Sequence, residues 1–167
     1  TMNNTSVGGI DPRNGEVFAY YETVGGGMGA GPTGPGLSGV HCHMSNSLNT
    51  PIEALEHAYP YRVTHYGIRR NSGGLGMYQG GDGLRRDLML LVPARVTLLC
   101  ERRTSGPPGT QGGKAGAPGE NVLICDGVER PLPGKTSFAV QAGDIISIRS
   151  PGGGGWGAIP EASRHES

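Results

Sequence analysis

The stretch "RRDLMLLVPARVTLLCERR", residues 85–103, contains two apolar runs on either side of Pro93. Each run is about as long as one β-strand and is rich in leucine and valine. Proline has no amide hydrogen to donate to a neighbouring strand, so Pro93 marks a break between the runs. The sequence therefore predicts two strands here, 85–92 and 95–103.

The same type of pattern extends along the chain in both directions. Similar β-type runs occupy 16–24 ("EVFAYYETV"), 121–128 ("NVLICDGV") and 138–150 ("FAVQAGDIISIRS"). Asp126-Gly127 is the dipeptide preferred by a tight hairpin turn, so a hairpin is expected there. Residues 37–45 ("LSGVHCHMS") alternate well enough to predict a further strand.

One segment has the signals of a helix, residues 50–59 ("TPIEALEHAY"). Thr50 can cap it, Pro51 suits its first position, and Glu53 completes a capping box. Strands and helices do not alternate, which argues against a doubly wound fold. We expect a mainly β protein, an antiparallel sandwich or partly closed barrel with one short helix and long glycine-rich loops. One domain is expected over residues 1–157, followed by a polar, disordered tail over 158–167.

The composition narrows the class of protein. The chain has 32 glycines and 13 prolines, but the glycines lie between apolar runs and follow no period of three, which excludes collagen. They predict turns and close backbone approaches in an ordered protein. The 14 basic and 14 acidic residues cancel and form no basic stripe, so nucleic acid is not expected as a partner. No apolar run reaches the roughly 18 residues that a membrane span needs, so no membrane partner is expected either.

Three widely spaced cysteines, Cys42, Cys100 and Cys125, are typical of reduced thiols in a cytoplasmic protein. Cys100 and Cys125 lie in apolar runs, which predicts small core residues.

Two glycine motifs resemble nucleotide-binding loops without meeting their requirements. "GGGMGA", residues 25–30, has the glycine spacing of a dinucleotide site, but "GPTGPG" follows it and cannot begin the helix that such a site needs. "GKT", residues 134–136, has Glu129 where a phosphate-binding loop requires glycine. A dinucleotide is therefore not expected to bind at the first motif, nor ATP at the second.

The stretch "GVHCHMSNSLNTPIE", residues 39–53, concentrates the side chains that can perform chemistry. On a strand, His41 and His43 would share one face. The pair could bind a metal with a third ligand such as Glu53, act as a base or contact a substrate, or simply be hydrogen-bonded in a polar sheet face. Asn49 suits a turn, whereas Asn46 is freer to face a ligand.

The chain begins at Thr1, with no methionine before it. A free N-terminal threonine can act as a nucleophile activated by its own amine. Methionine trimming, or a start inside a longer protein, would leave the same residue first. The sequence does not separate these explanations.

Several motifs in series resemble the C-terminal part of the hydantoinase B/oxoprolinase family. In order they are "TMNN", "YYETVGGGMGA", "GVHCHMSNSLNTPIEALE", "YPYRVTHYGIRRNSGGLGMYQGGDGLRRD", "GKAGAPGENVL", "RPLPGKTSF" and "GDIISIRSPGGGGWG". The resemblance extends from Thr1 to about Gly157. It implies kinship with N-methylhydantoinases, 5-oxoprolinases and ketone carboxylase subunits. In that family an A-type partner uses ATP and Mg²⁺ to phosphorylate a carbonyl or lactam oxygen, and the B part handles the activated species.

The resemblance also implies that this chain is incomplete as a catalyst. Full members are several times longer, and a divalent metal, where one is used, is expected in the upstream B segment, with no metal ligands in this chain. We expect the chain to form one wall of an active site for a small cyclic amide, completed by the A-type subunit and the remainder of the B-type polypeptide. The residues expected at that site are His41, His43, Asn46 and Thr1 for catalysis, and Asn49, Glu53, Gly26 and Gly27 for substrate binding. A ketone carboxylase component, a non-catalytic assembly module and a self-processed hydrolase with Thr1 as nucleophile are the alternatives.

Overall fold

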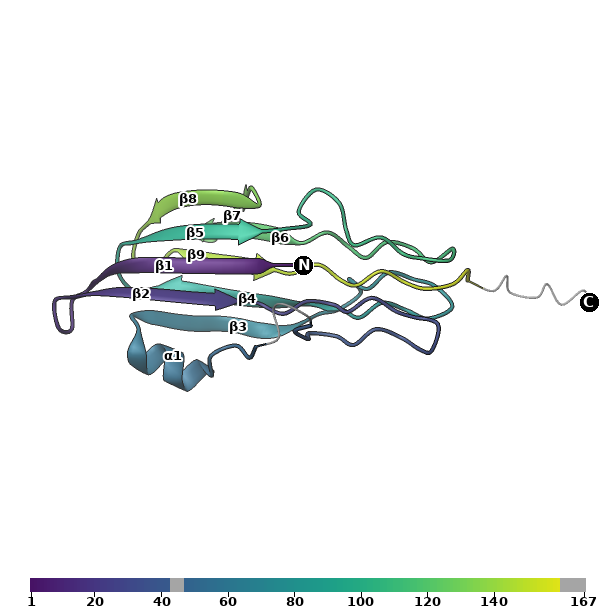
Figure 1. Ribbon diagram of the computed structural model, residues 1–167. Coiled ribbons are helices and arrows are strands. Elements are labelled where there is room, and N and C mark those ends of the chain that lie inside the picture. The colour runs from purple at the N-terminus through teal and green to yellow at the C-terminus, as the bar shows by residue number, and fades with distance from the viewer. Residues whose placement is uncertain (43–46, 160–167) are drawn as a thin grey trace, which may run out of the picture.

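The computed structural model describes residues 1–42 and 47–159, and these form two antiparallel β-sheets. Figure 1 shows the sheets face to face, with their strands running in similar directions. The four-stranded sheet has the order β2-β1-β5-β8 and the five-stranded sheet β3-β4-β9-β6-β7. Of the two predicted architectures, the sandwich is confirmed. The strands are β1 (Asn3–Asp11), β2 (Glu16–Thr23), β3 (Tyr61–Arg69), β4 (Gly83–Leu90), β5 (Ala94–Cys100), β6 (Glu120–Cys125), β7 (Val128–Leu132), β8 (Lys135–Val140) and β9 (Ile145–Arg149).

The two strands predicted around Pro93 are confirmed, and they belong to different sheets. β4 lies in the five-stranded sheet and β5 in the four-stranded sheet, so the chain crosses the sandwich between Leu90 and Ala94. Alternate residues of β5 are buried, including Val96 and Leu98, and they meet Leu88 of β4 in one core. Full burial of such a side chain contributes roughly 1.5–3 kcal/mol, so this stretch joins the two layers strongly.

Strand β1 was missed by the sequence analysis. It pairs with both β2 and β5 and is therefore interior to its sheet. Its inward positions include polar residues, Asn3 and Thr5, both fully buried. This polar-inward pattern hides the alternation by which a strand is normally predicted.

The strand predicted over residues 37–45 is wrong for its described part, 37–42. There, only Val40 makes a β-bridge, with Gly26, through hydrogen bonds of 2.9 and 3.0 Å. His41 is not part of a strand, and His43 lies outside the described residues, so the shared face of the two stays a prediction.

The helix α1 (Ile52–Ala58) exists, but its predicted cap is wrong. Pro51 occupies the cap position without a side-chain hydrogen bond, and Glu53 is exposed in the first turn. The Thr50 hydroxyl lies 3.1 Å from the hydroxyl of Tyr20. Thr50 therefore contacts the sandwich instead of capping its own helix.

The predicted hairpin at Asp126-Gly127 is confirmed. Both residues have positive φ, 51° and 78°, as a two-residue type I′ turn requires, and Cys125 pairs with Val128 across it. Cys100 is buried as predicted, whereas Cys125 is only partly buried.

The glycine-rich segments form a second ordered unit, which we call the glycine bundle: residues 25–38, 72–82, 106–117 and 150–157. Figure 1 shows them continuing from the strand ends and lying alongside one another. Gly153 donates to the Gly81 carbonyl (2.8 Å) and Gly155 to the Lys114 carbonyl (2.9 Å), while the Gly154 carbonyl accepts from Ala30 (2.9 Å). Three successive residues of segment 150–157 thus bond to three different neighbouring segments. This suits an extended chain with three residues per turn, in which successive residues point in three directions.

Close packing explains why these positions are glycine. A Cβ on Gly153 would lie 2.0 Å from the Met28 carbonyl oxygen, and one on Gly154 would lie 1.9 Å from that of Pro108. No side chain fits at such distances, so the backbones themselves fill the interior of the bundle. The predicted close backbone approaches are confirmed here.

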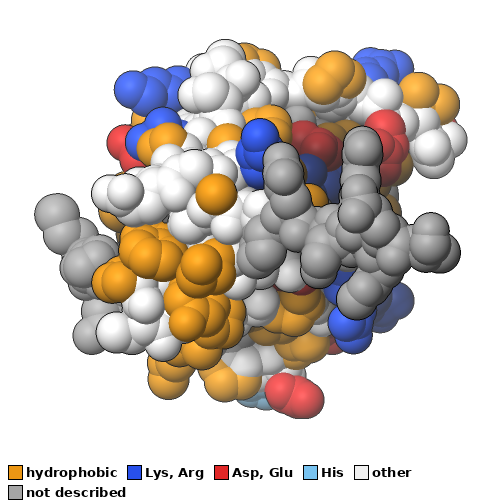
Figure 2. All heavy atoms as spheres, turned by 90° about the vertical axis from the view of Figure 1, so that its right-hand side faces the viewer, with side chains coloured by type: hydrophobic (Ala, Val, Ile, Leu, Met, Phe, Trp, Pro, Cys, Tyr) orange, Lys and Arg blue, Asp and Glu red, His pale blue; other side chains and the backbone are white. Residues whose placement is uncertain are grey.

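Figure 2 views the molecule from the bundle end and shows hydrophobic side chains gathered on part of that surface. Leu37, Leu75 and Met77 are the large hydrophobic residues of the bundle with more than half of their surface exposed. No helix in the described part of the chain is long and apolar enough to cross a membrane.

Candidate functional site

A buried ion pair connects the two sheets. Arg86, on β4, is fully buried, and its Nε donates to Glu22 Oε1 on β2 at 2.9 Å. The Arg86 Nη2 donates to the backbone carbonyl of Thr50 at 3.2 Å, and the guanidinium lies over the ring of Tyr66, 4.6 Å from its centroid. A charge taken out of water in this way is tolerated only when it is paired and hydrogen-bonded.

The second oxygen of Glu22 extends this pair into a network. Glu22 Oε2 accepts from the Tyr20 hydroxyl at 2.8 Å and from Asn49 Nδ2 at 3.1 Å. Asn49 Nδ2 also donates to the Thr23 carbonyl at 3.0 Å. With both donor bonds made, the orientation of the Asn49 amide is fixed.

His41 lies at the far end of the network, and its tautomer follows from Asn49. Asn49 Oδ1 accepts from the Tyr66 hydroxyl at 3.1 Å and lies 3.4 Å from His41 Nε2. Because that atom is an acceptor, His41 Nε2 has to carry the hydrogen. In the neutral imidazole, Nδ1 is then the basic nitrogen.

The glycine-rich loop holds His41 close to the sheet. Gly26 forms the bridge with Val40, and a Cβ on Gly25 would lie 3.1 Å from the Val40 carbonyl oxygen and 3.3 Å from Cδ2 of His41. Gly27 packs against the backbones of Gly81 and Gly153 within the bundle. The loop therefore positions His41 by backbone contact.

Two buried polar atoms of the network have no partner among the described residues, His41 Nδ1 and Arg86 Nη1. Leaving a buried polar group unpaired costs about 1–3 kcal/mol, and such groups are rare in native structures. The network therefore keeps unused hydrogen-bonding capacity, on one basic nitrogen and one guanidinium N–H, and both atoms are buried in this chain.

Burial keeps the two phenols of the network protonated. Burial, with the nearby Glu22 carboxylate, raises the pKa of Tyr20 to about 12. The pKa of Tyr66 is also raised, chiefly by burial. At neutral pH both hydroxyls therefore act as hydrogen-bond donors, to Glu22 and to Asn49.

The structure brings together two of the residues predicted for the site, His41 and Asn49. Thr1 and Glu53 are exposed and outside the network, and His43 and Asn46 lie outside the described residues. Gly26 and Gly27 support the loop, and their contact with a substrate stays a prediction. Within residues 1–42 and 47–159 no cluster of three or more His, Cys, Asp or Glu side chains is arranged to hold a metal ion.

The sequence analysis missed Glu22, Arg86, Tyr20 and Tyr66. A signal was present, because Glu22 shares the inward phase of Phe18 and Tyr20 in β2. Arg86 likewise shares the inward phase of the leucines of β4. A charge at an inward position of a strand is the pattern that would have found the ion pair.

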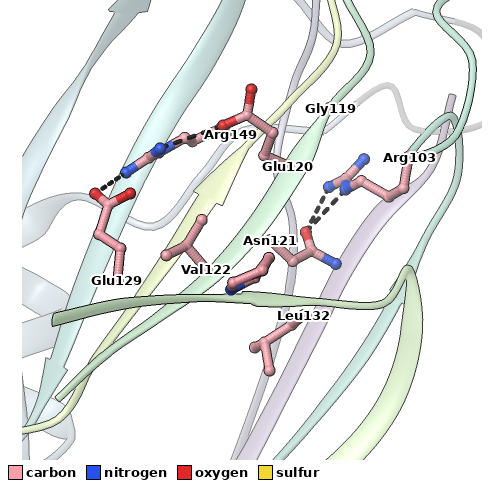
Figure 3. Close-up of a pocket in the computed structure, with 9 residues that line it drawn as sticks. Arg103, Gly119, Glu120, Asn121, Val122, Glu129, Leu132 and Arg149 are labelled. Carbon is pink, nitrogen blue, oxygen red and sulfur yellow. Dashed lines mark hydrogen bonds and ion pairs between the residues drawn. The ribbon is translucent and has the colours of Figure 1, made fainter.

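A second candidate, a hollow of about 390 Å³, lies beside the five-stranded sheet (Figure 3). Arg149 lies between Glu120 and Glu129 and is paired with both. Arg103 donates twice to Asn121 Oδ1, at 2.9 and 2.8 Å. Both arginines are already paired or hydrogen-bonded, which indicates that they crosslink neighbouring parts of the structure. The Arg86 network therefore remains the candidate site.

Comparison with known proteins identifies the protein family. The family model for hydantoinase B/oxoprolinase matches residues 1–159. The chain belongs to this family. It is 46% identical over 158 residues to 5-oxoprolinase 1 of Arabidopsis thaliana, covering 94% of this chain and 12% of that protein. It is 29% identical over 148 residues to the putative B-type component of a D-/L-hydantoinase from a Pseudomonas strain, covering 86% of this chain and 25% of that protein.

Two solved structures are similar to this chain in fold. The ATP-dependent caprolactamase from Pseudomonas jessenii matches with a TM-score of 0.77 at 27% identity, over 94% of this chain and 28% of that one. Acetone carboxylase matches with a TM-score of 0.66 at 20% identity, over 93% of this chain and 25% of that one, and shows the fold alone. The chain thus spans a minor part of each of these four proteins.

Proposed function

We propose that this chain forms one wall of the active site of an ATP-dependent hydrolase of cyclic amides of the hydantoin or 5-oxoproline type. An A-type ATP-using subunit and the remaining B-type segment complete the site. The observation that carries the proposal is the buried Arg86–Glu22–Asn49–His41 network with its unpartnered His41 Nδ1 and Arg86 Nη1. The names of the relatives, 5-oxoprolinase and caprolactamase, support a ring-opened cyclic amide as the chemistry.

The network has the parts that amide hydrolysis requires. Water adds to the carbonyl carbon, the C–N bond breaks, and the leaving nitrogen takes a proton. His41 Nδ1 accepts a proton from the attacking water and returns it to the departing nitrogen. Asn49 fixes the tautomer that leaves His41 Nδ1 without a hydrogen, and the buried Arg86 holds this arrangement through Glu22.

The chain does not supply the activation step. A phosphate group on the carbonyl oxygen would make that carbon electrophilic and would leave as inorganic phosphate when the carboxylate product forms. We assign ATP and Mg²⁺ for this step to the A-type subunit. A divalent metal, where one is used, is assigned to the remaining B-type segment. The half-buried His41 would then meet a substrate held from the other side by those partners.

The ketone-carboxylase alternative differs in the reaction of the activated species. A carboxylase forms a carbon–carbon bond to bicarbonate-derived carbon, whereas a hydrolase releases a ring-opened amino acid. Assaying one assembly with 5-oxoproline or hydantoin, and separately with a ketone and bicarbonate, distinguishes the two.

The test is turnover of an assembly reconstituted from this chain, the remaining B-type segment and the A-type subunit. His41→Ala is expected to lower kcat at least 100-fold, the usual size of a general acid–base contribution. His65→Ala is the matched control, since His65 is exposed on β3, and it should retain activity. Full turnover by the His41→Ala assembly would refute the proposed site.

A further inference from the structure

The two sheets have outer faces of opposite character. The outer face of the five-stranded sheet carries a row of ion pairs, Arg69–Glu120–Arg149–Glu129, and a separate pair of Arg85 with Asp87. Figure 3 shows the part of this row around Arg149. Charged pairs of this kind are typical of a sheet face that is in contact with water.

The outer face of the four-stranded sheet has few charges. We call it the smooth face, made up of the outward residues of β2, β1, β5 and β8. Its large apolar side chains are well exposed: Ile10 63%, Val17 82%, Tyr21 59% and Leu99 51%. Among its described outward residues, the charged ones are Arg95 and Lys135, both basic. An apolar surface of this kind is typical of a face that another element covers.

The middle of the smooth face is hollow. Gly8 has no side chain and pairs with Ala19, whose side chain is short. The larger pairs on either side are Ile10 with Val17 and Ser6 with Tyr21. A groove of about 580 Å³ lies along this line. Such a trough accommodates the ridge of side chains from a helix or a second sheet.

We infer that the smooth face is where the remaining part of the hydantoinase B-type polypeptide packs onto this chain. This inference rests on the proposed function, since it names the surface that joins two parts of the composite assembly. The occupant is an apolar helix or sheet face with acidic residues placed opposite Arg95 and Lys135.

Two observations favour this occupant. The chain matches 12% of 5-oxoprolinase 1 and 25% of the putative B-type hydantoinase component, so in those relatives most of the polypeptide lies outside the matching part and is covalently joined to it. Extensive apolar interfaces are typical of such permanent association. A second copy of this chain would instead bring like charges together, because a two-fold interface places Arg95 and Lys135 of both copies on the same face.

The test uses matched changes to glutamate on the two sheets. Val17→Glu and Ala19→Glu place a carboxylate on the smooth face, and Val128→Glu places one on β7 of the other sheet, where Val128 is 58% exposed. Each variant is first shown to fold, by its circular dichroism and thermal midpoint. The dissociation constant is then measured with the separately expressed remaining B-type segment, and in a second titration with the A-type subunit.

We expect Val17→Glu and Ala19→Glu to weaken binding of the B-type segment at least tenfold, and Val128→Glu to change it less than twofold. Unchanged binding, an effect confined to the A-type titration, or self-association of the free chain that Val17→Glu abolishes would each overturn the inference. At saturating B-type segment the Val17→Glu assembly should recover turnover, because its His41 network is intact. A catalytic failure of the proposed function would therefore be visible separately from a failure of binding.

Discussion

Arg86 is a charged side chain that the sandwich buries completely, in the same inward phase as Leu84 and Leu88. Its position is stable because Glu22, the Thr50 carbonyl and the Tyr66 ring surround the guanidinium. A well-packed apolar residue would often be at least as stable in such a place. The ion pair is therefore better explained by what its network holds in position, Asn49 and His41.

Removing Arg86 should strand the Glu22 carboxylate in the core. We expect Arg86→Met to lower the free energy of unfolding by about 3–5 kcal/mol, the usual cost of breaking a buried pair. Glu22→Gln in the same chain should recover part of that loss, because it removes the unpaired charge. Urea unfolding measures both, with Arg95→Met on the exposed face as a control within about 0.5 kcal/mol. An Arg86→Met protein as stable as wild type would contradict this account.

Tyr20 should make the protein sensitive to alkali. Burial raises the pKa of Tyr20 to about 12 in the folded state. A tyrosine in an unfolded chain has a pKa of about 10. The stabilisation is thus complete below about pH 10 and is lost as the pH rises from 10 towards 12. Two pKa units at 1.36 kcal/mol each would give about 2.7 kcal/mol, and solvent screening of the hydroxyl reduces the expected loss to roughly 2 kcal/mol.

Urea unfolding of wild type and Tyr20→Phe at pH 8, 10 and 11.5 tests this. The stability difference between the two proteins should shrink with rising pH, since phenylalanine cannot ionise. Parallel curves would show that Tyr20 does not titrate in this range.

The strands and turns whose pattern depends on residues adjacent in the sequence could be predicted. The Asp126-Gly127 turn and the apolar runs around Pro93 depend on neighbouring residues alone. Strand β1 could not be predicted, because its buried Asn3 is satisfied by distant groups, the Val24 carbonyl and Arg103. The Thr50 cap failed for the same reason, since Thr50 contacts Tyr20 and Arg86.

The residues of the candidate site also fall into two groups, those that could be predicted from the sequence and those that could not. His41 and Asn49 were predictable because they lie eight residues apart in one polar stretch. Glu22 and Arg86 are 64 residues apart in sequence and meet only once the two sheets pack. Their charges would suggest surface positions, and tertiary pairing overrides that preference.

The glycine bundle should tolerate alanine only where space exists. Gly153→Ala would put a Cβ 2.0 Å from the Met28 carbonyl oxygen, between backbones that have little room to move. We expect a loss of about 3 kcal/mol, the upper part of the range for overpacking. Gly31→Ala is the matched control, since nothing lies within 4 Å of its Cβ position, and should stay within about 0.5 kcal/mol. Thermal or urea unfolding compares them, and equal effects would refute close packing as the cause.

The whole molecule has two parts, the β-sandwich and the glycine bundle, and the chain passes repeatedly from one to the other. Segment 25–38 follows β2, 72–82 joins β3 to β4, 106–117 joins β5 to β6, and 150–157 follows β9. The bundle therefore receives segments from both sheets. Opening it would release strand ends on each layer of the sandwich.

This connectivity predicts a single unfolding transition. Trp156 lies in the bundle with its ring 6.0 Å from that of Tyr78, so its fluorescence reports on that part. Far-UV circular dichroism reports mainly on the strands. In urea the two signals should give the same midpoint. An earlier fluorescence transition would mean that the bundle melts independently.

The crowded glycines also limit which amino-acid substitutions the protein can accept during evolution. Alanine is the smallest replacement available to an encoded chain, and at Gly153 or Gly154 even its methyl carbon overlaps a carbonyl oxygen. Almost every missense change in those codons should therefore be harmful, while changes in the codons for exposed residues of β7, such as Val128, should have little effect. A deep mutational scan would show residues 152–155 as a block of intolerance in a stretch that carries no side chain.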